Sequence, residues 1–335
     1  MFTKKQKSIL ILILLLLASP LFLLGCDRLP PEVAQPLRQV PVLISRTADA
    51  LDDLSAMISA RLDELERRWK QQESGSATPL PQDSSFAVHF IDVGQADCAL
   101  VMCDGAYMLI DGGNAEDSDL VFSYLKKHGI DHLDYLVATH AHEDHIGGLS
   151  GAAYAATVGT ALSPVTEGST KVFKNLVKSL EQQNVSLTVP QPEDSFPLGS
   201  SQVRVLGPVK AYEEANDTSI VLSVTYGQTS FLFTGDMESA AEADLVESGA
   251  DLSATVLKVG HHGSSSSTSY RFLREVLPDY AIISVGEGNK YGHPNEEVLS
   301  RLSDAGATVY RTDLCGTIIA KSDGSTVTFQ TEKNR

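Results

Sequence analysis

The seven residues "THAHEDH" (139–145) bring together three of the nine histidines in the chain and two acids. In an extended segment, side chains two residues apart point the same way, so His140 and His142 could bind one metal ion. Asp144 and His145 follow where the chain is expected to turn into a helix, and they could reach a second ion close by. The segment therefore predicts a metal site with room for two ions. The alternative is a polar, solvated loop that happens to be rich in histidine.

Two further groups of candidate ligands stand at the ends of apolar, strand-like runs. Asp236 ends "FLFTGD", and His261 and His262 follow "LKVG". No histidine lies between His145 and Asp236, and no cysteine lies near these motifs. A mixed set of imidazoles and carboxylates suits zinc first, with manganese or iron as alternatives. The predicted ligands are His140, His142, Asp144, His145, Asp236 and one of His261 and His262.

The elements that position these residues begin at residue 86. Short β-rich runs come first, and Asp104-Gly105 marks a hairpin turn between "CALVMC" and "YMLIDGG". A buried strand, "LDYLVATH", leads directly into the metal segment, and a helix of small residues follows it. Further helices are expected at 116–128, 171–183, 238–247, 270–276 and 295–305. Hairpins followed by alternating strands and helices indicate an α/β sandwich of two sheets covered by helices, although composition alone does not choose it over another α/β layout.

Together these motifs resemble the metallo-β-lactamase superfamily over about residues 86–329. "THAHEDH" corresponds to its HxHxDH motif, "LIDGG" to its upstream aspartate, "TGD" to its bridging aspartate and "HHG" to its final histidine. The segments "FIDVGQADCALV", "NDTSIVLSV", "LKVGHHGS", "YGHP" and "RTDLCGTI" resemble the extracytoplasmic metallo-hydrolase domain of the competence DNA-uptake protein ComEC and its stand-alone relatives. The resemblance implies a four-layer αβ/βα sandwich with a two-metal site at one edge.

The resemblance also implies a division of the ligands between two divalent ions, most simply Zn²⁺, with Mn²⁺ as an alternative. His140 and His142 would bind the first ion, and Asp144 and His145 the second. Asp236 would bridge the two ions.

For the final histidine ligand of the family pattern, His261 is favoured over His262. Asp111 would brace the metal segment rather than bind metal. The chain lacks the histidine that most of the superfamily has between HxHxDH and the bridging aspartate, and the ComEC-like group shares this feature. The first ion, on His140 and His142, is therefore expected to be short of one protein ligand.

Two adjacent cations favour hydrolysis of a phosphoester, because they can activate a water and neutralise charge on both the entering and the leaving oxygen. Asp144 and Asp236 would hold or orient the hydroxide. His262, as the unliganded member of its pair, or His293 would protonate the leaving oxygen. The alternative for His293 is a loop residue that caps the helix after Pro294.

Five further residues are candidates for contacts around the site. By family position, Asn216, Ser264 and Lys290 would contact substrate phosphate, although on sequence alone each is an ordinary loop residue. Gln95 and Asp97 could line the site or could form hydrogen bonds at the end of a strand.

The formal net charge of −17 argues against a broad grip on nucleic-acid phosphates, so a polyanionic substrate would be held locally. The ComEC resemblance implies a phosphodiesterase or nuclease that acts on DNA. The alternatives are a smaller phosphodiester such as a nucleotide, a cell-wall component or a β-lactam as substrate. A further alternative is a non-catalytic lipoprotein whose metal segment is structural.

The N-terminus predicts export and membrane attachment. Lys4, Lys5 and Lys7 precede an apolar run over 9–24, and "LLGC" ends at Cys26. This pattern is typical of a bacterial lipoprotein signal over 1–26, and an uncleaved transmembrane anchor is the alternative. Both interpretations place the remainder outside the cytoplasm.

The segment between the N-terminus and the hydrolase domain, residues 27–85, predicts a tether, a stalk and a linker. Its first part is rich in proline and lacks periodicity. Apolar residues at helical spacing then predict an amphipathic helix over 47–72, which could serve as a stalk or for self-association. The predicted hydrolase domain covers 86–335.

Overall fold

The computed structural model describes residues 56, 59–60, 80–81 and 83–334. Contacts divide the chain into two units, 1–59 and 60–335, and the fold described below lies in the second. The predicted signal or anchor, the tether and nearly all of the predicted helix over 47–72 lie outside the described residues. None of the helices in the described part combines the length and the apolar character that crossing a membrane requires.

The first sheet has eight strands and holds most of the N-terminal half of the domain, together with the last two strands of the chain. In sheet order the strands are β15 (Val327–Thr331), β14 (Ile318–Ser322), β1 (Phe86–Phe90), β2 (Ala99–Cys103), β3 (Ala106–Ile110), β4 (His132–Val137), β5 (Thr157–Leu162) and β6 (Leu187–Thr188). The strands from β3 to β6 are parallel, and the other neighbours are antiparallel. The predicted hairpin between β2 and β3 is confirmed, with φ of 51° at Asp104 and 82° at Gly105, as a two-residue turn of this kind requires.

The second sheet has seven strands. In order they are β13 (Thr308–Arg311), β12 (Tyr280–Ile283), β11 (Val256–Lys258), β10 (Thr229–Phe233), β9 (Val221–Tyr226), β8 (Ser201–Gly207) and β7 (Ser195–Leu198). The strands from β10 to β13 are parallel, whereas β7 to β10 are joined in antiparallel fashion.

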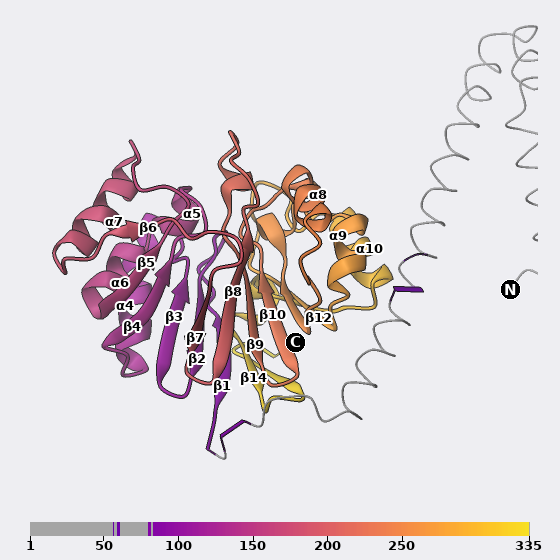
Figure 1. Ribbon diagram of the computed structural model, residues 1–335, viewed down its shortest axis with the longest axis horizontal. Helices are drawn as coiled ribbons and strands as arrows, with labels where there is room; N and C mark the ends of the chain where they lie inside the picture. Colours follow the sequence, from indigo (N-terminus) through magenta and orange to yellow (C-terminus); the bar gives the residue numbers. More distant parts are fainter. Residues whose placement is uncertain (1–55, 57–58, 61–79, 82, 335) are drawn as a thin grey trace, which may run out of the picture. The chain divides into compact units, whose positions relative to one another are not determined.

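Helices cover the outer faces of both sheets, as Figure 1 shows. Those beside the first sheet are α4 (Ser118–Lys127), α6 (Leu149–Ala155) and α7 (Lys171–Glu181), and those beside the second are α8 (Ser239–Glu247), α9 (Tyr270–Val276) and α10 (Glu296–Asp304). Short elements lie in the loops: α5 (Glu143–Ile146), α11 (Thr312–Cys315), η1 (Ala115–Asp117), η2 (Asn216–Thr218) and η3 (Gly260–Gly263). The predicted four-layer αβ/βα sandwich is confirmed.

Alternating side chains of the strands build two separate cores. Val101 of β2 belongs to the core between the sheets, together with Phe231 and Phe233 of β10. Its neighbour Leu100 points the other way, into a core that includes Leu125 of α4. A strand with both faces buried needs apolar residues at every position, which is why "ALVMC" has no polar alternation.

The predicted helices and strands are found in the structure, with one shifted helix boundary, but β5, β6 and β7 were not predicted. The helix expected over 116–128 begins as η1 and becomes α4 only at Ser118. No strand was expected between Gly148 and the helix at 171, but β5 lies there. Its sequence, "TVGTAL", contains a glycine and two threonines, so its apolar signal is weak.

Candidate metal centre

Four side chains from three separate loops converge at the ends of β4, β10 and β11. Asp144, His145, Asp236 and His262 each offer one ligand atom, and these atoms lie within 4.8 Å of one another. Nε2 of His145 is 3.2 Å from Oδ1 of Asp236. Nε2 of His262 is 3.4 Å from Oδ2 of Asp144 and 3.7 Å from Oδ2 of Asp236. These are mixed imidazole and carboxylate ligands of the kind that zinc and manganese accept.

The backbone around two of these ligands, Asp236 and His262, is unusual. Gly235 takes φ of 50°, which turns the chain so that the backbone N–H of Asp236 donates to Oγ of Ser219 at 3.0 Å. His261 and His262 both lie in the left-handed region, with φ of 49° and 53°. Non-glycine residues seldom adopt this conformation, and when they do they are concentrated at functional sites.

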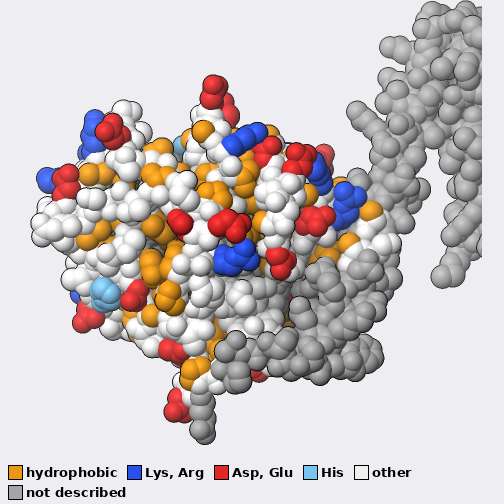
Figure 2. All heavy atoms as spheres, in the orientation of Figure 1, with side chains coloured by type: hydrophobic (Ala, Val, Ile, Leu, Met, Phe, Trp, Pro, Cys, Tyr) orange, Lys and Arg blue, Asp and Glu red, His pale blue; other side chains and the backbone are white. Residues whose placement is uncertain are grey.

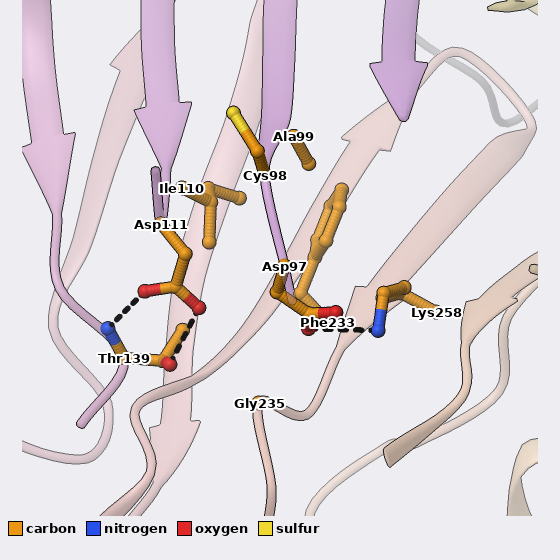
Figure 3. A pocket seen from close by; sticks show the side chains of 9 residues that line it. All are labelled: Asp97, Cys98, Ala99, Ile110, Asp111, Thr139, Phe233, Gly235 and Lys258. Carbon is orange, nitrogen blue, oxygen red and sulfur yellow. Dashed lines mark hydrogen bonds and ion pairs between the residues drawn. The ribbon is translucent and has the colours of Figure 1, made fainter. Parts of the chain in front are cut away.

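Asp111, at the end of β3, orients His145. Its Oδ2 lies 2.7 Å from Nδ1 of His145, and its oxygens accept hydrogen bonds from the backbone N–H and the hydroxyl of Thr139 at 2.8 and 2.7 Å. Figure 3 shows Asp111 and Thr139 joined in this way. Because Nδ1 is occupied by Asp111, the other ring nitrogen is directed toward Asp236, as in the carboxylate–histidine pairs of metal sites.

Asp97 and Lys258 form a buried ion pair behind His262. Nζ of Lys258 is 2.8 Å from Oδ2 of Asp97, and both side chains are less than 8% exposed. Oδ1 of Asp97 is 3.3 Å from Nδ1 of His262, which is also 3.0 Å from the carbonyl oxygen of Ser284. The pair lines a cavity of about 10 Å³, drawn in Figure 3, which is about the space of one water molecule.

Lys258 was missed by the sequence analysis, although a lysine inside the apolar run "ATVLKVG" is itself a signal. A buried lysine needs a partner of opposite charge. Here that partner is Asp97, for which the sequence left two roles open. The structure places Asp97 beside a candidate metal ligand and not at the surface of the site.

The charges in the group are strongly coupled. Burial alone would lower the pKa of both inner histidines, but neighbouring carboxylates reverse this effect. Asp236 and Asp111 raise the pKa of His145 well above its ordinary value. Asp236, Asp97 and Asp144 raise the pKa of His262 to about 10. The same imidazoles outweigh burial at Asp236, so the pKa of its carboxyl lies well below its usual range.

Whether a metal ion fits this group can be judged from its unsatisfied atoms. Among the described residues, Nε2 of His145, Nε2 of His262 and Oδ1 of Asp236 are buried and have no hydrogen-bond partner. When Asp111 accepts a hydrogen bond from Nδ1–H of a neutral His145, Nε2 presents a lone pair to the carboxylate of Asp236. Two buried acceptors repel each other unless a cation lies between them. The group therefore fits a divalent ion. Without the ion, His145 and His262 would each carry an additional proton instead.

His140 and His142 lie beside this group. Nε2 of His140 is 3.0 Å from Nδ1 of His142 and 4.0 Å from Oδ2 of Asp236. Burial and the nearby His145 lower the pKa of His140 to about 3, so its ring is neutral and its lone pair is available. Within the described range, no group of three or more ligands forms around this pair. Asp236 is thus within reach of an ion bound by this pair.

Comparison with known proteins decides the family. The sequence model of the metallo-beta-lactamase superfamily matches residues 91–287, which is more than half of the chain. The chain belongs to the metallo-β-lactamase superfamily. Membership in the superfamily implies binding of divalent metal, in agreement with the ligand group described above, and supports a metal-dependent hydrolase in general terms.

The most similar relatives within the superfamily include two competence proteins. The chain is 31% identical over 255 residues to ComE operon protein 3 of Bacillus subtilis, covering 70% of this chain and 33% of the relative. It is 31% identical over 243 residues to competence protein ComA of Neisseria gonorrhoeae, covering 70% of this chain and 32% of the relative. The chain thus spans about a third of the length of these curated relatives.

Solved structures of superfamily proteins are more distant in sequence. YhfI from Bacillus subtilis, described as a metallo-beta-lactamase fold protein, is 13% identical with a TM-score of 0.48, covering 73% of this chain and 100% of that one. CmlA from Streptomyces venezuelae, described as a diiron beta-hydroxylase, is 15% identical with a TM-score of 0.47, covering 73% of this chain and 55% of that one.

For the final histidine of the superfamily pattern, the geometry favours His262 over His261, the reverse of the sequence-based choice. His262 is buried and belongs to the four-ligand group. His261 is 24% exposed, and its Nε2 lies 3.8 Å from Oδ2 of Asp236. Because successive left-handed residues turn the two rings to different sides, the sequence "HHG" alone could not have distinguished them.

Glu238, which the sequence analysis did not single out, connects several of the expected contact residues. Its Oε1 lies 3.2 Å from Nδ1 of His261 and accepts hydrogen bonds from Asn216 at 3.1 Å and Ser266 at 3.2 Å. Ser264 is tied to this cluster through Ser266, with 3.0 Å between their hydroxyl oxygens. Asn216 and Ser264 are therefore connected to His261 through Glu238 and Ser266.

The last two expected residues lie in the loop after β12. The ring of His293 is 5.8 Å from that of His261, and burial, His261 and His262 lower its pKa. Lys290 is exposed, with its ammonium 5.2 Å from the ring centre of Tyr291. Gln95 accepts a hydrogen bond from the backbone N–H of Gly286 at 3.1 Å and so anchors the start of this loop.

Proposed function

We propose that this chain is a phosphodiesterase that hydrolyses nucleic acid or nucleotides with two divalent ions. The observation that carries the proposal is the position of Asp236 between two pairs of candidate ligands. Its Oδ1 faces His145 at 3.2 Å, and its Oδ2 lies 4.0 Å from His140 and 3.7 Å from His262. A carboxylate placed in this way can be shared by two adjacent ions.

Bound there, two divalent ions would supply an activated water and neutralise charge on the phosphate oxygens. Zn²⁺ is the first choice for this donor set and Mn²⁺ the second. The residues of the chain perform the remaining tasks. His145 and His262 present Nε2 toward Asp236, because Asp111 and the carbonyl oxygen of Ser284 hold the far sides of their rings.

Protonation of the leaving oxygen requires a histidine outside the ligand group. His262, first assigned this role, lies inside that group, so the role passes to His261, with His293 as the second candidate. Oε1 of Glu238 lies 3.2 Å from Nδ1 of His261 and fixes the position of this ring, whereas burial lowers the pKa of His293. Glu238 acts here as a positioning residue.

Two observations support a phosphodiester as the substrate. The first is that two of the relatives are competence proteins. The second is that the chain has a net charge of −17, so metal ions at the site would provide the local positive charge that binds a phosphate. Asn216, Ser264 and Lys290 are the proposed phosphate contacts beside it. A β-lactam or a wall ester is the alternative substrate, and a metal site without catalysis is the alternative function.

Turnover of bis-p-nitrophenyl phosphate by the full chain with Zn²⁺ or Mn²⁺ tests the proposal. We expect hydrolysis that chelation abolishes and that Asp144→Ala lowers at least about 100-fold. Asp119→Ala, on the outer helix α4, is the matched control and should leave the rate unchanged. No turnover with any divalent ion would overturn the proposal, and turnover of nitrocefin alone would favour a β-lactam.

The proposed location is outside the cytoplasm, with attachment to a membrane through lipid on Cys26. Labelling of the expressed chain with radioactive palmitate tests this, since label should appear on the wild type and disappear in Cys26→Ser. An unlabelled wild type retained in membranes would favour the uncleaved anchor. Self-association through residues 47–72 predicts a dimer or higher oligomer by light scattering, lost on deletion of that segment.

A further inference from the structure

An exposed aromatic residue stands at the rim of the metal centre and is connected to it by a row of rings. His261 lies 3.8 Å from Asp236, and the ring centres of His261 and His293 are 5.8 Å apart. The ring of Tyr291 follows, stacked on His293 with 5.7 Å between centres and 26° between planes. Tyr291 is 58% exposed. The row therefore leads from the proposed proton donor, His261, to an aromatic surface in solvent.

The side chain of Asn289 makes four hydrogen bonds within the loop that carries Tyr291. Nδ2 of Asn289 donates to the carbonyl oxygens of Gly286 at 3.0 Å and His293 at 2.6 Å. Its Oδ1 accepts from the backbone N–H groups of Tyr291 and His293, both at 3.1 Å. With four such bonds, the loop is already ordered before any ligand arrives. Binding to a surface that is already ordered avoids the entropy loss of ordering it.

The polar groups around Tyr291 suit a ligand with both a ring and a phosphate. The ammonium of Lys290 lies 5.2 Å from the ring centre of Tyr291, and at an exposed site this attraction is weak enough for the ammonium to move to a phosphate oxygen. Glu287 is also exposed and lies in the same loop. Its negative charge would repel a second phosphate there. Among the described residues, the buried Nδ1 of His293 has no hydrogen-bond partner.

From this arrangement we infer that Tyr291 is a stacking platform for the nucleobase next to the phosphodiester being cleaved. The inference rests on the proposed function and narrows its substrate to compounds that carry a base. A nucleotide joins its base to its phosphate through one sugar ring, and the row of rings joins the metal centre to Tyr291. Every base has an aromatic face, so such a platform accepts all sequences. A base inside a duplex is already stacked on its neighbours, so the platform takes single strands or unpaired ends.

The experiment compares two oligonucleotides of equal length and charge, cleaved by the full chain with Mn²⁺. One is oligothymidylate, and the other has abasic tetrahydrofuran residues in place of the thymidines. Tyr291→Ala should lower kcat/KM on oligothymidylate about 5- to 150-fold, the range expected for loss of one stacked base, and leave cleavage of the abasic chain unchanged. Tyr291→Phe keeps the aromatic face and should retain the wild-type rate on both.

Two results would overturn the platform while leaving the proposed function intact. One is a wild type that cleaves both oligonucleotides equally well, and the other is an equal loss on both in Tyr291→Ala. A wild type that cleaves neither oligonucleotide would instead overturn the proposed function, and the platform with it. Because Tyr291 is exposed, its replacement should leave the melting temperature unchanged, so a loss of rate can be separated from a loss of fold.

Discussion

At the scale of single residues, each inner imidazole of the metal centre has a carboxylate close to the far side of its ring. Asp111 contacts Nδ1 of His145, and Asp97 lies beside Nδ1 of His262. Asp97 has in addition a buried partner in Lys258. Removal of one member of a buried ion pair leaves an unpaired charge in an apolar medium, which costs more free energy than removal of both.

Replacement of Lys258 should therefore affect stability and metal binding separately. Lys258→Met leaves Asp97 unpaired and should lower the free energy of unfolding by about 3–5 kcal/mol. It should also weaken Zn²⁺ binding about 10- to 100-fold, as loss of an outer partner of a metal ligand does. The double variant Asp97→Asn/Lys258→Met should recover most of the stability but not the affinity. Urea unfolding and calorimetric titration measure the two effects, and a single variant within about 1 kcal/mol of the wild type would contradict this account.

The raised histidine pKa values predict opposite pH trends with and without metal. In the folded, metal-free chain the pKa of His262 is about 10, above the unfolded value of about 6.5. Protonation of His262 therefore stabilises the fold fully below about pH 6.5, and this stabilisation is lost as the pH rises toward 10. We expect the melting temperature of the chelated chain to fall by at least about 4 °C between about pH 6.5 and 9.5. Zn²⁺ affinity should rise over the same range, because the ion displaces the protons.

Thermal melts with and without chelator, together with titrations in buffers of different ionisation enthalpy, check both trends. A metal-free melting temperature that stays constant or rises across this range would contradict the assigned protonation.

At the scale of elements, close backbone contact places the metal segment against the loop after β3. A Cβ atom on Gly148 would meet the carbonyl oxygen of Gly112, and one on Gly147 would meet the backbone of Ala115. Only glycine permits this approach, which brings α5 and its ligands beside Asp111.

Gly148→Ala should therefore disturb the site from outside it. The added methyl group must displace backbone, so we expect a loss of about 1–3 kcal/mol in the free energy of unfolding and weaker Zn²⁺ binding. Ser150→Ala, two residues further along, is the matched control and should change neither quantity. Equal stability and affinity in Gly148→Ala and the wild type would show that the loop can move without cost.

The elements also show what the sequence could and could not predict. Long apolar or periodic runs gave correct predictions of β4, α7 and α10 and of the two-sheet sandwich, because burial enforces such patterns. Strand β5 was missed because threonine and glycine weaken its signal. The inward position of His262 depends on two left-handed residues in succession, and the roles of Lys258 and Glu238 depend on partners far away in the sequence. Neither kind of information lies in a local pattern.

At the scale of the whole molecule, charge sets the expected mode of substrate binding. The chain has 26 basic and 43 acidic residues, and on the face drawn in Figure 2 the two kinds are interspersed. Such a surface can bind few phosphates of a nucleic acid at once, so the metal centre and Lys290 would make most of the contacts with the substrate.

Weak salt dependence of DNA cleavage follows from this distribution of charge. The slope of log kcat/KM against log salt concentration on long single-stranded DNA should be no steeper than about −2, since each contacted phosphate contributes about −0.7. Rate measurements over a series of KCl concentrations give the slope. A slope of about −5 or steeper would reveal an extended basic surface that this account does not include.

The most direct test of the central claim is the rate of bis-p-nitrophenyl phosphate hydrolysis by Asp236→Asn at saturating Mn²⁺. The substitution keeps the size of the side chain but removes the charge that is shared between the two ligand pairs. We expect a loss of at least about 100-fold in kcat, because the two ions would no longer be held together at one shared carboxylate. A rate within a few-fold of the wild type would contradict a two-metal centre built on Asp236.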